Sequence, residues 1–126
     1  MAIRVVRLGS PRETGEGLRI GTVRRPPRGV PKKDFSRLNY YDVWLPQLAP
    51  SAELVKWIQE RGEQGWKQFE KQFLRELSNP DATRLLDLLA ALSRSADFSI
   101  GCYCEKETRC HRSILKRVLM ARGATI

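Results

Sequence analysis

The chain has few residues of the types that build disulfide scaffolds or membrane spans. It contains three cysteines and one histidine among 126 residues, and an odd number of cysteines without a secretory signal predicts reduced thiols. Runs of eighteen or more apolar residues are absent, and Arg4 and Arg7 stand where a signal peptide needs its apolar centre. We therefore expect a cytoplasmic protein without a membrane span.

The sequence also lacks the residue patterns of several common classes of enzyme and nucleic-acid-binding protein. The sequence has neither a Gly-rich nucleotide loop nor the paired carboxylates of a glycosidase. Aromatic residues make up 8% of the chain and are not interleaved with basic ones, which disfavours a base-stacking platform for single strands. Sequence-specific nucleic-acid recognition is disfavoured as well, because no helix-turn-helix, zinc-finger or RNA-recognition signature occurs.

Positive charge is present in excess, mainly at the two ends of the chain. The formal net charge is +9. Residues 1–40 hold ten Lys and Arg against three Asp and Glu, residues 41–97 hold seven against nine, and residues 98–126 hold six against two. A fold that brings the ends together would create one surface for phosphates, nucleic acid or another anion. A solvated basic surface explains the charge equally well.

Strand and helix patterns alternate along the chain. Short β-branched or apolar runs predict strands over 3–8, 18–23 and 98–104, the last buried on both faces, and an irregular strand over 43–49. Prolines and charges predict a long loop over 24–42. Residues 1–126 are therefore expected to form one α/β domain, a three-layer Rossmann-like arrangement with a small, mostly parallel sheet flanked by helices. An α+β arrangement is the alternative.

Helices are predicted in the middle and at the end. Ser51 is expected to cap a helix that stops at Gly62, and Asn79 before Pro80 begins another. The apolar stripes at helical spacing are Trp66, Phe69, Phe73 and Leu77 in one helix and Leu85, Leu88, Leu89 and Leu92 in the next. A final helix is predicted over 113–123, and a start at Thr108 would bring Cys110, His111 and Arg112 into its first turn.

Three segments, "EGLRIGTVRRPPRG", "APSAELVKWI" and "WKQFEKQFLREL", resemble the YeaO-like family of bacterial domains of unknown function (DUF488). The matching positions are Arg19, Arg24, Pro27, Arg28, Gly29, Pro50, Ser51, Leu54, Trp66, Phe69, Glu76 and Leu77. Val23 and Pro26 stand where the family often has Asp and Trp, so any role of that Asp is lost here. The resemblance covers nearly the whole chain and implies an α/β fold without an established activity.

The "CHR" at 110–112 is similar to a segment in one branch of that family, while other members lack the cysteines. A function common to all members therefore cannot depend on these thiols. Ligands of open α/β sheets bind beyond the carboxyl ends of the strands, which here means the loop after Val23 and the segment after Cys104. We expect an anion pocket there, formed by the side chains of Arg24, Arg28, Arg109 and Arg112.

Thiol-assisted chemistry on an anionic small molecule is the first interpretation, with Cys104, Cys110 and His111 as candidate catalytic residues. A cysteine in the first turn of a helix and near arginines should have a lowered pKa. Cys104 would then be the nucleophile or the resolving thiol. Its spacing to Cys110 is similar to the Cys-x5-Arg loop of phosphatases, but Arg109 comes one place too soon.

Two further interpretations stay open, and whether the protein is an enzyme is undecided. A phosphate or nucleic-acid binding module would use the basic loop 24–37 without catalysis and without a cofactor. A metal site would use Cys102, Cys104, Cys110 and His111. Against a metal site, Cys110 and His111 as neighbours on a helix diverge by about 100°, and Cys102 could equally be a core side chain. Arg28 could likewise have a structural role in place of anion binding, as part of a buried ion pair with Glu76 or Asp42.

Overall fold

The structure is a computed structural model that describes residues 2–104 and 110–126. Its strands are β1 (Ile3–Arg7), β2 (Leu18–Gly21), β3 (Val43–Trp44) and β4 (Phe98–Cys102), and its helices are α1 (Ala52–Arg61), α2 (Trp66–Glu76), α3 (Pro80–Leu92) and α4 (His111–Ala121). Short 3-10 turns cover Lys32–Asp34, Pro46–Leu48 and Gly62–Gly65. The predicted α/β fold is confirmed. Within the described ranges, helices fall short of the length and apolar character needed to cross a membrane.

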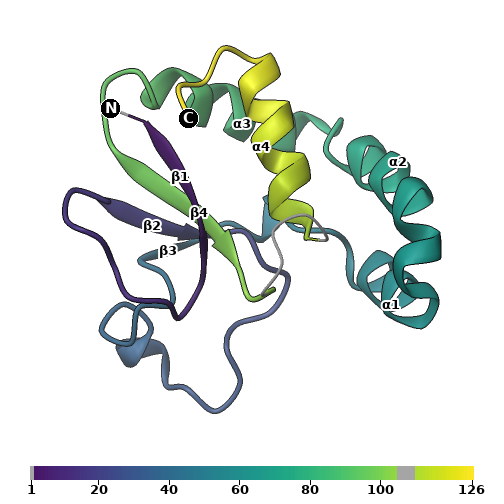
Figure 1. Cartoon of the computed structure of the whole chain (residues 1–126), viewed down its shortest axis with the longest axis horizontal. Coiled ribbons are helices and arrows are strands. Elements are labelled where there is room, and N and C mark those ends of the chain that lie inside the picture. Colours follow the sequence, from purple (N-terminus) through teal and green to yellow (C-terminus); the bar gives the residue numbers. More distant parts are fainter. Residues whose placement is uncertain (1, 105–109) are drawn as a thin grey trace.

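The sheet has the strand order β1-β4-β2-β3, and all of its pairings are parallel (Figure 1). Ile100 in the central strand β4 lies between Val5 of β1 and Ile20 of β2. Every residue of β4 is buried, which confirms the prediction of a strand buried on both faces. Because β2 and β4 are adjacent and parallel, the segments that follow them leave the sheet at the same edge.

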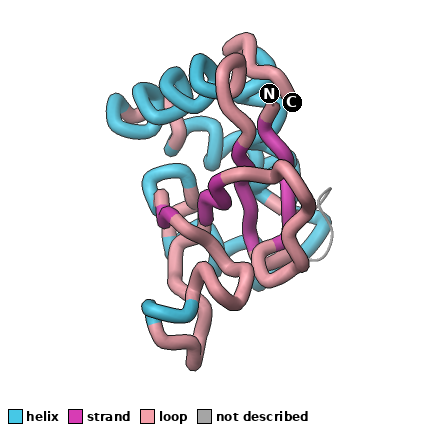
Figure 2. The backbone as a smooth tube through the Cα atoms, turned by 90° about the vertical axis from the view of Figure 1, so that its left-hand side faces the viewer, coloured by secondary structure: helices cyan, strands magenta, loops and turns pink. Residues whose placement is uncertain are grey.

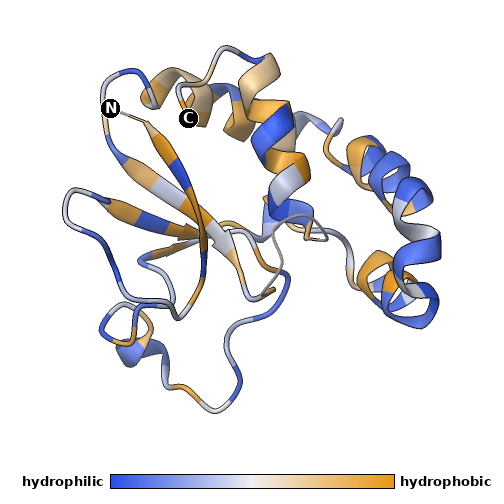
Figure 3. Cartoon of the chain, in the orientation of Figure 1, coloured by the Kyte–Doolittle hydropathy of each residue, from blue (hydrophilic) through white to orange (hydrophobic). Residues whose placement is uncertain are grey.

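The helices cover one face of this sheet. Ile20, Phe98 and Ile100 of the strands share a core with Leu86 of α3 and Leu115 of α4, and Figure 1 shows α3 and α4 on the same side of the strands. The predicted stripe of α2 is confirmed by its buried aromatic side chains. Hydrophilic residues cover much of the rest of α2 in Figure 3, as expected for a helix that buries one narrow stripe.

The buried side of α3 differs from the prediction. Leu88 and Leu92 of the expected stripe are 58% and 39% exposed, respectively, whereas the buried residues of the helix are Ala82, Leu86, Leu89 and Ala90. Leucines lie on several sides of this helix, so periodicity did not determine which side would be buried. The two alanines allow closer packing on the side that the core uses.

The predicted helix starts are confirmed at α1 and α3. The Ser51 hydroxyl accepts a hydrogen bond from the Leu54 N–H at 3.2 Å, and the Asn79 side chain accepts one from the Ala82 N–H at 3.0 Å. Glu76 also accepts from the backbone N–H and the hydroxyl of Ser51, at 2.8 and 2.6 Å. This carboxylate therefore joins the end of α2 to the start of α1.

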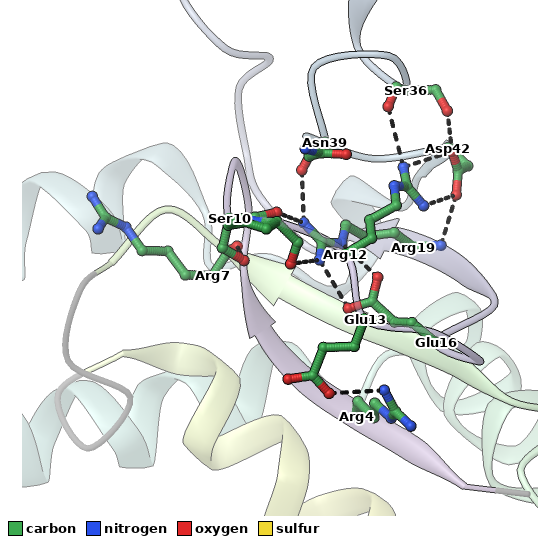
Figure 4. A network of polar contacts seen from close by, with 11 residues as sticks. Arg4, Arg7, Ser10, Arg12, Glu13, Glu16, Arg19, Ser36, Asn39 and Asp42 are labelled. Atoms are coloured by element: carbon green, nitrogen blue, oxygen red, sulfur yellow. Dashed lines mark hydrogen bonds and ion pairs between the residues drawn. The ribbon is translucent and has the colours of Figure 1, made fainter.

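Loops cover the other face of the sheet, and a polar network holds them there (Figure 4). The guanidinium of Arg19 is fully buried; it donates to Glu16 Oε1 at 2.8 Å and to the carbonyl of Asn39 at 2.7 Å. Asp42 accepts from Arg12 Nη1 at 2.9 Å and from the Arg19 backbone N–H at 2.8 Å. Figure 2 shows loop segments in front of the strands on this side.

The long loop 24–42 is irregular as predicted, apart from its 3-10 turn. Near its end the Tyr41 ring packs directly against Gly21, where any Cβ would overlap the ring. The strand predicted over 43–49 is shorter than expected: it ends at Trp44, and Pro46 begins a 3-10 turn. Proline has no N–H to donate to a sheet, so its position limits this edge strand.

Candidate functional site

A cavity of about 640 Å³ lies at the carboxyl ends of β2 and β4. Its walls come from residues 23–28 after β2, from the segment after β4, from the first residue of α4 and from α1. Arg24 and Arg28 line it together with Cys104 and His111. The two strand-end segments singled out in the sequence therefore do face one cavity.

The cavity is lined by more basic than acidic side chains. Arg24, Arg25, Arg28 and Lys56 contribute positive charge, and Glu53 contributes one negative charge. All of these except Arg24 are exposed. Lys56 was not predicted, because it lies on the solvent side of α1 and has no motif around it.

Arg24 has a structural role as well as a place in the wall. Its Nε donates to the carbonyl of Pro50 at 2.9 Å and its Nη2 to the carbonyl of Ala49 at 3.0 Å. These bonds tie the loop after β2 to the residues just before α1. Arg28 is exposed and makes neither of the ion pairs considered for it, since Glu76 bonds Ser51 and Asp42 bonds Arg12.

Arg112 is placed differently from the prediction. It is 4% exposed and donates from Nη2 to the carbonyl of Cys104 at 2.9 Å, and it does not line the cavity. This hydrogen bond ties Cys104, just after β4, to the first turn of α4. Arg109, also predicted as an anion ligand, lies outside the described residues.

The helix α4 begins at His111, with Cys110 as its N-cap residue. The predicted start at Ser113 was too late, and Thr108 lies outside the described residues. Cys110 has extended backbone angles, φ −129° and ψ 148°, so it is not in helical register with His111. For that reason the 100° divergence expected of helical neighbours does not apply, and Cys110 Sγ lies 3.8 Å from His111 Nδ1.

The structure joins Cys102 and Cys110 as a disulfide and leaves Cys104 free. The prediction that all three cysteines are reduced is therefore wrong for this pair. The end of β4 and the N-cap of α4 lie side by side, which brings together two buried residues separated by eight positions. Their spacing in the sequence carried no sign of this contact.

His111 is held as a neutral ring. Its Nε2 donates to the carbonyl of Thr22, which leaves a lone pair on Nδ1. Burial lowers the pKa of His111 to about 4, with the Arg112 charge acting in the same direction and the Thr22 bond acting against it. Thr22 is itself fixed, because its N–H and its hydroxyl both donate to the carbonyl of Gly101 at 3.0 Å.

Cys104 carries the free thiol in the cavity wall. Partial burial raises the pKa of this thiol above its ordinary value, although the charges of Arg112 and Arg7 oppose the shift. At neutral pH the thiol form predominates. The lowered pKa was predicted for Cys110 at the helix start, and Cys110 is joined to Cys102 in this structure.

A second cavity of about 350 Å³ adjoins the first and shares Cys104 and His111 with it. Its walls include Ile58, Trp66 and Phe69, so it is mainly apolar. The thiol and the imidazole therefore lie between a basic compartment and an apolar one.

The fold and site define a parallel α/β domain with a basic cavity at the carboxyl edge of its sheet. A family model described as "DUF488-N3a: Active DUF488-N3 subclade" matches residues 3–123. The chain therefore belongs to the DUF488 family of domains of unknown function, and the YeaO-like resemblance is compatible with this match. Comparisons with curated proteins and with solved structures give no match.

Proposed function

We propose that the cavity binds an anionic small molecule and that the thiol of Cys104 acts on it. One observation carries this proposal: four basic side chains and a free thiol line the same cavity at the edge where α/β sheets bind ligands. Arginine side chains bind phosphate and carboxylate groups with paired hydrogen bonds. Arg25 and Arg28 are exposed at the cavity and are the main candidates for this contact.

The adjoining apolar cavity extends the proposal to the shape of the ligand. Its aromatic and aliphatic walls favour an uncharged, apolar portion. A molecule with an anionic group at Arg28 and an apolar group near Trp66 would place its central atoms beside Cys104 and His111. We therefore propose a substrate with these two parts.

The proposed step is nucleophilic displacement. A bond forms between Cys104 Sγ and an electrophilic atom of the substrate, and the bond from that atom to its leaving group breaks. The leaving group departs with the bonding electron pair, and the thiol proton passes to solvent. Because the pKa of Cys104 is raised, the thiolate fraction and the rate should increase as pH rises above neutrality.

Protection of Cys104 against alkylation tests the proposal. Iodoacetamide labelling of Cys104 should slow in the presence of inorganic phosphate or pyrophosphate. Arg28→Gln should weaken this protection by about tenfold, as loss of a charged hydrogen bond implies. Arg37→Gln, a change on the same loop but outside the cavity wall, should leave the protection unchanged. If neither anion slows labelling, or if both variants behave alike, the proposal is wrong.

A second candidate function is phosphate-backbone binding of nucleic acid without catalysis. The exposed residues Lys32, Lys33 and Arg37 continue the positive charge of Arg25 and Arg28 along the same loop. Such binding should weaken steeply with salt. The triple variant Lys32→Gln, Lys33→Gln, Arg37→Gln should lower the salt dependence of binding to a labelled oligonucleotide while phosphate protection of Cys104 persists. Absence of oligonucleotide binding at low salt would exclude this candidate.

A further inference from the structure

Cys102, Cys110 and His111 form a compact group that the proposed displacement does not use. One ligand atom from each residue, two sulfurs and a ring nitrogen, lies within 4.8 Å of the others. The two cysteines are only 1% and 2% exposed. Two sulfurs and one imidazole are a donor set that suits Zn²⁺ and related divalent cations.

His111 presents an unprotonated ring nitrogen, as a metal ligand requires. Because Nε2 donates to the carbonyl of Thr22, the lone pair of Nδ1 is available and lies 3.8 Å from Cys110 Sγ. Zinc bonds of about 2.3 Å to sulfur and 2.0–2.1 Å to nitrogen place these two ligand atoms about 3.6 Å apart in a tetrahedron. Histidines that bind metals usually donate their other N–H to a carbonyl or carboxylate, and the fixed carbonyl of Thr22 fills this role.

The backbone spacing of Cys102 and Cys110 also suits two metal ligands better than it suits a permanent disulfide. The Cα atoms of Cys102 and Cys110 are 7.7 Å apart, wider than the roughly 4.4–6.8 Å usual for disulfides. Two thiolates around one cation need no bond between their sulfur atoms. The extended conformation of Cys110 turns its sulfur toward His111, which removes the objection raised by their adjacent positions in the sequence.

We infer that Cys102, Cys110 and His111 bind one Zn²⁺ or similar divalent cation when the disulfide is reduced. A dithiol reductant supplies two electrons and two protons to the disulfide and is oxidised to its own disulfide. The cation then displaces the two thiol protons. Since Cys102 and His111 both line the larger cavity, the fourth coordination position is open toward it, and Cys104 stays free.

Cobalt titration of the reduced, metal-free protein without oxygen tests this site. One Co²⁺ per chain should bind with the absorption of thiolate–cobalt charge transfer and of tetrahedral cobalt, and Zn²⁺ should displace it. Cys102→Ser, Cys110→Ser and His111→Asn should each lower the affinity by more than about 100-fold, because even partners outside the ligand set contribute 10–100-fold. The matched control Cys104→Ser should bind as the unchanged protein does. Oxidised protein should bind no cobalt until it is reduced with dithiothreitol.

Two results would overturn the inference. One is the absence of charge-transfer absorption at micromolar Co²⁺ from reduced protein with a native circular dichroism spectrum. The other is a loss of affinity in Cys104→Ser as large as in Cys110→Ser. A variant that fails to fold is replaced by Cys→Ala or His111→Gln at the same position. Phosphate protection of Cys104 is measured on metal-free protein, so the anion proposal and the metal site can fail separately.

Discussion

At the residue scale, the reactivity of Cys104 depends on the charges beside its thiol. Burial raises the pKa, and Arg112 and Arg7 lower it in part. Arg7 lies at the end of β1 and donates from Nε to the carbonyl of Tyr103 at 3.2 Å, next to Cys104 in the chain. Its positive charge therefore favours the thiolate.

We predict that Arg7→Gln raises the pKa of Cys104 further. The rate of alkylation at a fixed pH should fall, and the pH profile should move to higher pH, as measured by mass spectrometry of labelled Cys104. Arg4→Gln is a matched control, because Arg4 also lies on β1 but pairs with Glu13 at 3.0 Å. Equal shifts in the two variants, or no shift in either, would contradict this account.

The sequence predicted part of the site at this scale. The expected pocket held Arg24, Arg28, Cys110, His111 and Arg112, because ligands of parallel sheets lie beyond the strand ends. Arg24, Arg28 and His111 line the larger cavity, and Cys110 lines the adjoining one. Arg112 bonds the carbonyl of Cys104, a contact that nothing in the sequence indicates. Contacts of this kind arise only when two segments are packed together.

At the scale of single elements, α3 gives a direct test of which side of a helix is buried. Leu86 is fully buried, whereas Leu88 is 58% exposed. Leu86→Ala should lower the free energy of unfolding by about 2–5 kcal/mol, since it leaves a cavity in the core. Leu88→Ala on the same helix should change it by less than about 0.5 kcal/mol. Urea denaturation of both variants measures the difference, and equal effects would mean that the buried side is wrongly assigned.

The helix starts show what local sequence can and cannot predict. Ser51 and Asn79 are residue types that favour N-cap positions, and both were predicted correctly. The N-cap of α4 is Cys110, whose side chain makes no capping hydrogen bond. Preferences of residue types favoured Thr108 instead, so the arrangement of Cys110 and His111 could not be foreseen.

At the scale of the whole molecule, Asp42 connects two loops to the sheet and should make folding sensitive to acid. Burial would raise its pKa, but hydrogen bonds from Arg12, Ser36 and the Arg19 backbone lower the pKa of Asp42 to about 2. Its ordinary value in an unfolded chain is about 3.9. Between these values the unfolded state binds more protons, so stability is present above about pH 4 and is lost as pH falls toward 2.

We predict that Asp42→Asn lowers the free energy of unfolding at pH 7 by about 1–2 kcal/mol, less than the full pKa difference implies because solvent screens this exposed residue. The variant should also lose much of the decline in stability between pH 4 and pH 2, as urea titrations at several pH values would show. Asp87→Asn removes an exposed surface pair with Arg122 and should change stability by less than about 1 kcal/mol. A similar acid response in protein with and without the Asp42 carboxylate would refute the prediction.

The strand order and the covering of the second face were beyond sequence reasoning. Spacing predicted the existence of β1, β2 and β4, but β4 lies between β1 and β2, which are consecutive in the chain. The sheet face away from the helices is covered by loops held around Arg19. The burial of Arg19 depends on partners twenty or more positions away in the chain, such as Asn39 and Asp42.

The parallel pairing of β1 with β4 has a consequence for synthesis on the ribosome. Ile3 lies opposite Phe98, and β1 occupies an edge of the sheet whose neighbour is β4. At about 5–20 residues per second, roughly 5–20 s pass between the synthesis of β1 and that of its partner. Throughout this interval the apolar residues of β1 lack their strand partner, so the nascent chain exposes an apolar segment that chaperones can bind, and β1 joins the sheet only after β4 has been synthesised.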